Sequence, residues 1–271
     1  MSSEAEFEFT KENIDTYLQA VAKEYRKRVG KSMPAELILV GGASVLINYG
    51  FRNATTDVDA VIEAASSMKD AINAVCDRMG LPNGWLNADF RQTASYSSRL
   101  TEVSVYYRTF SNVVHVRTVS AEYLIAMKLR AGRRYKNDLS DVIGILTEHQ
   151  NRGTPITLEQ IHRAVTELYG GWEALSELSR QFIQDTMSSG QIETLYEQVI
   201  EGEHQNREML LTFEQQYPGV MTEENVDVIT DTLRQKADRI SVRAQLQKLK
   251  ENQKRAEQLL TREKKSRGEE R

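Results

Sequence analysis

Two aspartates at alternate positions are the residues whose spacing first suggests chemistry in this chain. The segment "TDVDAVIE" is typical of a β-strand, in which Asp57 and Asp59 would point to the same face, about 6.6 Å apart along the chain. Carboxylates placed in this way can bind the same divalent cations, and Mg²⁺ commonly takes one or two of them together with substrate phosphates. The solvated face of an ordinary strand would have the same pattern.

A pair of glycines lies shortly before the aspartates. "AELILV" is typical of a short buried strand, and Gly41 and Gly42 follow it, ahead of Ser44 in the expected helix "ASVLINYG", which we expect to end near Gly50. Glycines let a backbone approach a phosphate closely, and the N–H groups at a helix N-terminus favour an anion. A tight turn would also explain two glycines. The glycines followed by the aspartates are more specific than either pair alone.

A second group of charged residues lies further along the chain. Lys128 falls in "SAEYLIAMKLRAGR", an expected helix with Ser120 as its cap. Asp138 and Asp141 fall near the start of the next expected helix, for which Asn137 is a candidate cap. A phosphate needs cations such as Lys128. Acidic residues at a helix start also favour the helix dipole, so a purely structural explanation of both aspartates stays open.

The expected elements alternate between helix and strand up to about residue 118. Helices are expected over 11–29 and 66–79, "LPNGWLNADF" is typical of a loop, and "EVSVYYRTF" and "VVHVRTV" are typical of strands joined by a hairpin at "SN". From there on the pattern is helical, with a start at Thr154 or Thr157, further helices across 172–217 and one long helix over 222–265. The last residues, "KSRGEER", are expected to be disordered.

Composition is that of an ordinary globular protein. The 271 residues are 40% hydrophobic and 27% charged, and no run approaches the roughly 18 apolar residues of a membrane span. The acidic N-terminal segment lacks the pattern of a signal or transit peptide. The single cysteine, Cys76, allows no intramolecular disulfide. We expect Cys76 to be a small core residue of a cytoplasmic protein without membrane contact.

The C-terminal segment differs in charge from the rest of the chain. Residues 234–271 carry a net charge of +7, whereas the remainder carries −11. A basic helix of this kind could bind nucleic acid or another acidic surface, or pair with a second copy of the chain. A solvated helix with a frayed end would have the same composition.

The segment "GGASVLINYGFRNATTDVDAVIE" resembles the signature of the polymerase-β-like nucleotidyltransferase superfamily, in which Gly-Gly or Gly-Ser precedes Asp-x-Asp. Its "R…T.D.D" pattern is similar to that of the bacterial group related to AbiEii-type toxins. The later segment "EYLIAMKLRAGRRYKNDLSDVIGIL" is similar to a further motif of that group. The residues at the positions of this motif are Lys128, Arg133, Arg134, Asp138, Leu139 and Asp141. The resemblance covers about residues 35–149.

The resemblance implies an α/β fold with two parts. Residues 1–150 would form a polymerase-β-like nucleotidyltransferase core, a small mixed sheet with flanking helices. Residues 151–271 would form an all-helical region that ends in the long basic helix. Many active members of the superfamily carry a third carboxylate, for which Glu102 at a strand edge and Asp89 in a loop are the candidates.

The resemblance also implies roles for single residues. Asp57 and Asp59, with Glu102, would bind Mg²⁺ or Mn²⁺, and Asp138 would assist in the site, for example as a base. The residues that would contact the phosphates of an NTP substrate are Gly41, Gly42, Ser44, Arg52 and Lys128. Arg52 could equally orient its loop or pair with an acid.

The implied activity is transfer of an NMP from an NTP to an acceptor, which would be RNA such as tRNA, a protein hydroxyl or a small molecule. The chain would then be the toxin of a toxin–antitoxin or phage-defence module, with an antitoxin as partner. Two alternatives stay open. One is a catalytically degenerate nucleotide-binding protein of the same fold, and the other is a nucleic-acid-binding or homo-oligomeric role of the basic C-terminal helix.

Overall fold

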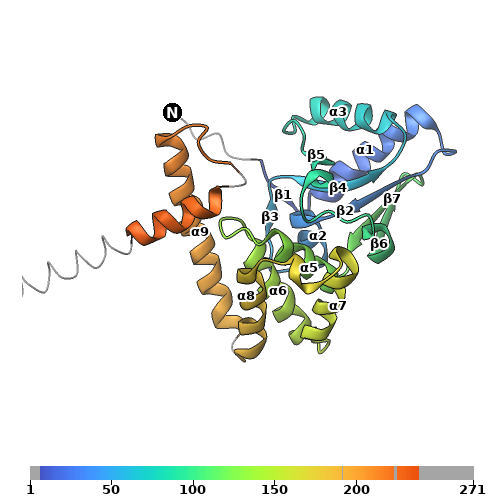
Figure 1. Cartoon of the computed structure of the whole chain (residues 1–271). Helices are drawn as coiled ribbons and strands as arrows, with labels where there is room; N and C mark the ends of the chain where they lie inside the picture. The colour runs from blue at the N-terminus through green and yellow to red at the C-terminus, as the bar shows by residue number, and fades with distance from the viewer. Residues whose placement is uncertain (1–6, 191, 223–224, 238–271) are drawn as a thin grey trace, which may run out of the picture. The chain divides into compact units, whose positions relative to one another are not determined.

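The computed structural model describes residues 7–190, 192–222 and 225–237, shown in Figure 1. The chain forms two compact units, residues 1–203 and residues 204–271. All predicted site residues belong to the first unit. Because this unit ends at residue 203, it includes helices beyond residue 150. The predicted division of the chain at residue 150 stays a prediction.

A mixed five-stranded sheet is the centre of the first unit. Its strand order is β5-β4-β2-β7-β6, with β2 antiparallel to β4 and parallel to β7. The strand bounds are β2 Ala35–Leu39, β4 Val58–Glu63, β5 Leu86–Asn87, β6 Ser104–Phe110 and β7 Val114–Val119. A separate two-stranded sheet pairs β1 Phe9–Thr10 with β3 Ala54–Thr55. The small mixed sheet that the resemblance implies is thereby confirmed.

Helices cover both faces of the five-stranded sheet (Figure 1). The helices α1 Ile14–Val29 and α3 Ser67–Met79 pack on one face, against Val58 and Ala60 of β4. Val61 of the same strand points into the opposite core, which also contains side chains of α5 Ala121–Ala131, α6 Asp138–Asn151, α7 Leu158–Tyr169 and α8 Glu177–Ser188. This alternation of faces along β4 follows the period of two in a strand. Each fully buried Val or Ile side chain contributes ~1.5–3 kcal/mol to these cores.

The hairpin between β6 and β7 forms where "SN" predicts it. Ser111 and Asn112 both have positive φ angles, 52° and 54°. The Val113 N–H donates to the Phe110 carbonyl oxygen across this turn. Two left-handed residues give the turn the twist that joins antiparallel strands without splaying them. In β6, the register of pairing with β7 is irregular between Tyr106 and Arg108.

Several expected elements have different bounds in the structure. Helix α2 spans Gly41–Asn48, so it includes both glycines and ends before Gly50. The expected loop "LPNGWLNADF" contains β5 and the start of the 3-10 helix η1, Asp89–Gln92. The beginning of the expected strand "EVSVYYRTF" is instead part of a short helix, α4 Leu100–Val103. Loops and short elements carry few periodic apolar residues, so their sequence pattern does not distinguish them.

The expected helix caps are only partly correct. Thr157 begins α7 with a capping box to Gln160, which decides between the two predicted starts. Ser120 occupies the cap position of α5, but its side chain makes no capping hydrogen bond, and its hydroxyl donates to the Val103 carbonyl oxygen. Asn137 likewise occupies the cap position of α6 without a side-chain capping bond.

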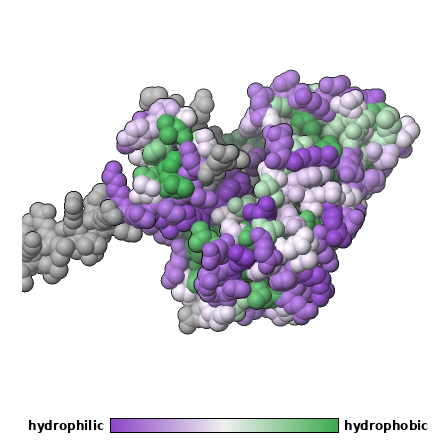
Figure 2. Space-filling model, viewed as in Figure 1, coloured by the Kyte–Doolittle hydropathy of each residue, from purple (hydrophilic) through white to green (hydrophobic). Residues whose placement is uncertain are grey.

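The 3-10 helix η2 Trp172–Ala174 precedes α8, and helix α9 Ile192–Gln216 follows it. Residues 226–237 are also helical. The rest of the predicted helix over 222–265 and the basic tail lie outside the described residues, and the long C-terminal helix stays a prediction. In the described part of the chain, no helix is long and apolar enough to cross a membrane. The face shown in Figure 2 is mostly hydrophilic, with apolar side chains in small separate areas.

Gly144 in α6 lies against the ring of Phe51, and an added Cβ would approach the ring carbons to 2.5 Å. We expect Gly144→Ala to destabilise the fold by about 1–3 kcal/mol through overpacking, although alanine is the better helix former. Urea denaturation measures the difference. Gly50→Ala is the matched control, because an added Cβ there meets nothing within 4 Å. Equal stability of the two variants would mean that Phe51 can move aside at little cost.

Candidate functional site

The glycine pair and the Asp-x-Asp segment come together at the start of helix α2. Asp59 is the second residue of β4 and is half-buried, whereas Asp57 is exposed just before the strand. Gly41 has a φ of +55°, and an added Cβ would lie 3.6 Å from Asp59 Oδ2. Glycine is therefore the residue that suits this left-handed position beside the carboxylate.

Gly42 permits a second close approach. An added Cβ would lie 2.6 Å from Thr55 Oγ1 and 2.9 Å from Arg52 Nη2. Arg52 passes over this glycine, donating from Nε to the Ala54 carbonyl oxygen at 3.1 Å and from Nη1 to Asp141 Oδ2 at 2.6 Å. Arg52 thus both orients its own loop and pairs with an acid. These contacts engage the guanidinium that the sequence analysis assigned to phosphate.

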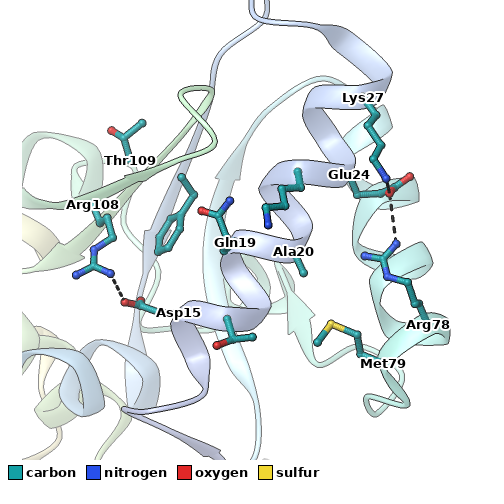
Figure 3. A pocket seen from close by; sticks show the side chains of 12 residues that line it. Asp15, Gln19, Ala20, Glu24, Lys27, Arg78, Met79, Arg108 and Thr109 are labelled. Atoms are coloured by element: carbon teal, nitrogen blue, oxygen red, sulfur yellow. Dashed lines mark hydrogen bonds and ion pairs between the residues drawn. The ribbon is translucent and has the colours of Figure 1, made fainter.

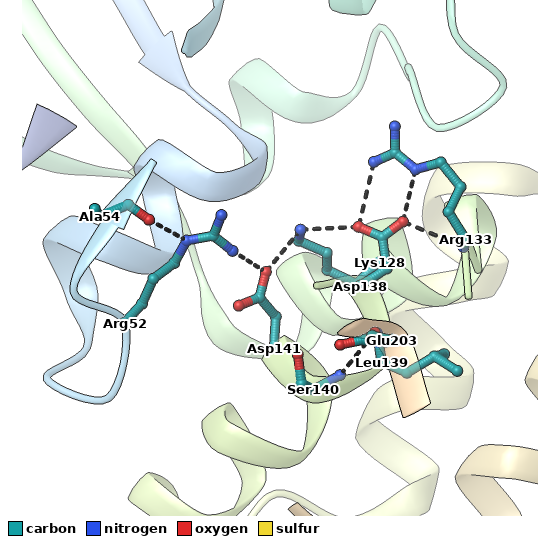
Figure 4. Close-up of polar contacts among 9 residues, drawn as sticks. All are labelled: Arg52, Ala54, Lys128, Arg133, Asp138, Leu139, Ser140, Asp141 and Glu203. Atoms are coloured by element: carbon teal, nitrogen blue, oxygen red, sulfur yellow. Dashed lines mark hydrogen bonds and ion pairs between the residues drawn. The ribbon is translucent and has the colours of Figure 1, made fainter. Parts of the chain in front are cut away.

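Asp141 belongs to a continuous chain of buried ion pairs, drawn in Figure 4. Lys128 Nζ lies 2.8 Å from Asp141 Oδ2 and 2.9 Å from Asp138 Oδ1. Asp138 in turn binds Arg133 Nε at 2.7 Å. The Lys128 and Asp138 side chains are only 8% and 1% exposed. Charges this deeply buried persist only when they are paired, and removing one partner of such a pair costs about 3–5 kcal/mol.

The ion pairs fix the protonation states of Asp138 and Lys128. Burial alone would raise the pKa of the Asp138 carboxyl, but Lys128 and Arg133 hold that pKa well below its ordinary value. Burial alone would lower the pKa of Lys128, and Asp141 and Asp138 reverse this and raise it. Asp138 is therefore an ionised carboxylate whose oxygens already accept hydrogen bonds from Lys128 and Arg133. This arrangement suits the positioning of neighbours better than transfer of a proton.

Asp59 is in a different electrostatic situation. Burial, followed by the charge of Asp57, raises the pKa of the Asp59 carboxyl. Asn87, Lys136 and Arg133 partly oppose this increase. Two carboxylates that repel each other in this way gain from a bound cation, so both residues fit a divalent metal ion together with phosphate oxygens.

Asn87 and Lys136 are residues of the site that the sequence analysis missed. Asn87 lies directly across from Asp59 in the register of β4 and β5. No sequence signal marks Asn87, because its two-residue strand lies in a segment with the composition of a loop. Lys136 is exposed in the loop between α5 and α6, and the basic run "RRYK" was a signal for it.

Three predicted roles are not supported by the arrangement of the side chains. Ser44 is fully buried, and its Oγ accepts a hydrogen bond from the Val119 N–H, so its contact with a phosphate stays a prediction. Glu102 lies on α4 and not on a strand, and it pairs with Arg99 on the surface. Lys128, expected to contact a triphosphate, is enclosed by the two aspartates.

Among the described residues, no group of three or more acidic, His or Cys side chains could hold a metal ion. Asp89, the other candidate carboxylate, is exposed on η1.

A side chain from outside the predicted motifs caps helix α6. Glu203 in α9 is only 4% exposed, and its Oε1 accepts hydrogen bonds from the Leu139 N–H at 2.9 Å and the Ser140 N–H at 3.3 Å. These are N–H groups of the first turn, which the side chain of the preceding cap residue would usually bind. Glu203 thus makes the bonds that were expected of Asn137.

A hollow of the described surface lies away from these residues. Figure 3 shows this groove of about 900 Å³, which is lined by residues of α1, α3 and β6 and by none of the predicted site residues. Its cations are largely paired, Arg108 with Asp15 and both Lys27 and Arg78 with Glu24. The groove therefore offers little unbalanced charge for a phosphate, and we place the candidate site at Asp59.

Comparison with known proteins gives a family for this part of the chain. Residues 16–150 match the model of a family described as "Nucleotidyltransferase of unknown function (DUF6036)". The matched residues include the glycine pair, both aspartates and the whole chain of ion pairs, and they end within the last turn of α6. No curated protein and no solved structure matches the chain. The similarity to AbiEii-type toxins stays a prediction.

Lys128 is the residue through which the buried ion pairs can be tested. We expect Lys128→Met to reduce the free energy of unfolding by about 3–5 kcal/mol, because Asp138 and Asp141 lose their shared cation in the interior. Lys27→Met is the matched control, since Lys27 forms an exposed surface pair with Glu24 and such pairs contribute little to stability. Chemical denaturation measures both. Similar losses in the two variants would contradict a stabilising role of the buried chain.

Glu203 predicts a pH dependence of stability. Burial raises the pKa of its carboxyl from 4.5 to about 7, with a further contribution from Asp141, while the Leu139 and Ser140 groups oppose this. The folded state therefore holds a proton that the unfolded state releases. This contribution to stability is fully present below about pH 4.5 and is lost as the pH rises through 7. We expect the melting temperature of the wild type to fall relative to that of Glu203→Gln over this range. Parallel curves would show that Glu203 does not titrate there.

Proposed function

Because residues 16–150 match the model of a nucleotidyltransferase family, we propose that this chain transfers a nucleoside monophosphate from an NTP to an acceptor hydroxyl and releases pyrophosphate. The observation that carries this proposal is the position of Gly41, which lies at the start of α2 and next to Asp59. A Cβ added at Gly41 would lie 3.6 Å from Asp59 Oδ2. A helix N-terminus that accepts anions and a carboxylate pair that accepts cations are thereby adjacent. An NTP with its divalent ion needs both.

Asp57 and Asp59 would hold Mg²⁺ or Mn²⁺ together with the triphosphate. When bound, such an ion neutralises charge on the phosphates and polarises the phosphorus under attack. The exposure of Asp57 and the partial burial of Asp59 leave the pair open to solvent on one side. Because no third carboxylate joins them among the described residues, we expect metal binding to depend strongly on the nucleotide.

The backbone of α2 and the loop between α5 and α6 would bind the phosphates. The first N–H groups of α2 have no partners within the helix, and the absence of a side chain at Gly41 lets phosphate oxygens approach them. The charges of Arg133 and Lys136 act on Asp59, and these two side chains would be the cations for the departing pyrophosphate. Lys128, Asp138 and Asp141 hold this loop and do not contact the substrate.

The reaction itself requires mainly positioning. The acceptor oxygen forms a bond to the α-phosphorus while the bond from that phosphorus to the bridging oxygen breaks, and the electron pair leaves with pyrophosphate. Preorganised charges that do not need to rearrange lower the barrier for such a step. The buried ion pairs supply this rigidity, since each of their charged groups is fixed by at least one partner.

The acceptor and the biological setting are proposals that rest on the resemblance alone. RNA, including tRNA, a protein hydroxyl and a small molecule are the candidate acceptors. A role as the toxin of a two-gene module, with an antitoxin as partner, follows from the similarity to AbiEii-type toxins. A role of the basic C-terminal segment in binding nucleic acid or a second copy concerns residues outside the described ones.

A second candidate function is favoured by one specific observation. The described residues contain only two adjacent carboxylates at the site, whereas many active members of the superfamily use three. A protein with this deficit could bind an NTP without transferring it, and would act as a sensor or a partner subunit.

One experiment separates the two functions. The full chain is incubated with each α-labelled NTP, Mg²⁺ or Mn²⁺, and total RNA with cell protein. We expect label to move into one acceptor class and to fall ~100-fold or more in Asp57→Asn/Asp59→Asn, because the metal-binding charges are removed. Asp77→Asn, an exposed residue of α3, is the control and should keep full activity.

The other outcomes are equally informative. Absence of transfer together with NTP-dependent thermal stabilisation of the wild type would favour the binding protein. Neither transfer nor stabilisation would contradict both functions. Transfer that persists in the double variant would show that the chemistry takes place elsewhere in the chain.

A further inference from the structure

Glu203 combines features that a simple helix cap does not need. A hydroxyl or amide side chain can satisfy the first N–H groups of a helix without burying a charge. Glu203 instead buries a carboxylate to 4% exposure, and its Oε2 has no hydrogen-bond partner among the described residues. Leaving an oxygen of a buried carboxyl group without a hydrogen-bond partner opposes folding, whether the group is charged or neutral. A contribution other than stability is therefore a reasonable explanation for this residue.

The helix turn that Glu203 caps is the one that organises the candidate site. The Leu139 and Ser140 N–H groups, which Glu203 binds, lie between Asp138 and Asp141 in the sequence. Through Asp138, the turn fixes Arg133, whose charge acts on the Asp59 carboxyl. The same turn also fixes the residue that passes over the glycine pair, because Asp141 binds Arg52.

The charges around this turn are balanced when Glu203 is ionised. Three carboxylates and three cations meet there, namely Asp138, Asp141 and Glu203 with Arg52, Lys128 and Arg133. Within the described part of the chain, Asp138 and Asp141 form ion pairs, whereas the hydrogen bonds of Glu203 go to the turn itself, to the Leu139 and Ser140 N–H groups. Glu203 therefore acts on the orientation of the turn and not on a particular cation.

We propose that Glu203 is a positioning residue for the nucleotidyl transfer site, which fixes the first turn of α6 so that Asp138 and Asp141 hold Arg133 and Arg52 in place. This inference rests on the proposed function. It also extends the site beyond the residues that match the family, since Glu203 lies in α9, 53 residues after the matched region ends at residue 150. The helical segment after residue 150 thus contributes to the site and does not merely follow it.

The test compares Glu203→Ala and Glu203→Gln in the full chain. The alanine variant removes the bonds to Leu139 and Ser140, whereas the amide oxygen of glutamine can still accept both. We expect Glu203→Ala to lower kcat/KM for the NTP about ten- to a hundred-fold, as removal of residues that orient functional groups commonly does. Glu203→Gln should restore most of this activity.

Thr157→Ala is the matched control, because it removes the cap of α7, which carries none of the site residues. Loss of this cap should destabilise the fold to a similar degree and leave kcat/KM within about twofold of the wild type. If Thr157→Ala lowers kcat/KM as much as Glu203→Ala does, general destabilisation explains both effects and the inference is wrong.

Amide hydrogen exchange provides a readout that does not need turnover. We expect Glu203→Ala to speed exchange in the first turn of α6 and in residues 132–137 about five- to thirty-fold, with exchange in α7 unchanged. A wild type without transfer activity would refute the proposed function, and the exchange data would still decide whether Glu203 holds this turn. Unchanged exchange in Glu203→Ala would overturn the inference. If the alanine variant fails to fold, Glu203→Gln decides, since a loss of kcat/KM with normal exchange would contradict positioning through these two bonds.

Discussion

The ammonium group of Lys128 is the point on which the candidate site depends. It lies between two carboxylates in the interior, where an uncompensated charge would be expensive. Asp138 and Asp141 are three residues apart on α6 and therefore share a face of that helix, so that a single cation can bind both. The same pairings fix α6 against α5, which carries Lys128. The loop between these helices, with its cations near Asp59, is held at both of its ends.

Two glycines allow the segment between α2 and β4 to pack against helices α2 and α6. Phe51 and Arg52 are neighbours in the sequence, and each lies against a glycine, Gly144 in α6 and Gly42 in α2. A side chain at either glycine would displace one of them. The segment between α2 and β4 is thereby packed tightly between two helices. The charge of Arg52 stabilises the same contact, because its partner Asp141 is on α6, the helix that Phe51 touches.

The sequence was informative where a role depends on neighbours in the chain. The sheet core, the hairpin at Ser111 and Asn112, and the adjacency of the glycine pair to Asp59 follow from local periodicity and turn chemistry. Roles that depend on distant partners could not be predicted in this way. Whether Ser44 faces a phosphate or the Val119 N–H is decided by how α2 sits on β7, 75 residues away in the chain.

The same limit applies to the charged residues. Arg52 and Asp141 are 89 positions apart. The sequence left open that Arg52 pairs with an acid, but it did not identify Asp141 as the partner. Lys128 has the residue type and the motif position of a phosphate ligand, but only the fold shows that two aspartates enclose it. Nothing in the sequence near Glu203 distinguishes it from other glutamates of a polar helix. Its role arises because α9 returns to the N-terminus of α6.

The irregular register of β6 has a consequence for how copies of this protein behave together. A sheet ends in two open edges, and a straight, exposed edge strand can pair with a strand of another molecule. Here one edge strand, β5, has only two residues, while the other, β6, carries an irregularity between Tyr106 and Arg108. Neither edge offers a long regular ladder, although Val105 and Tyr106 are exposed. The sheet is therefore protected against growth by strand addition, and the chain can be concentrated without templating its own aggregation through this sheet.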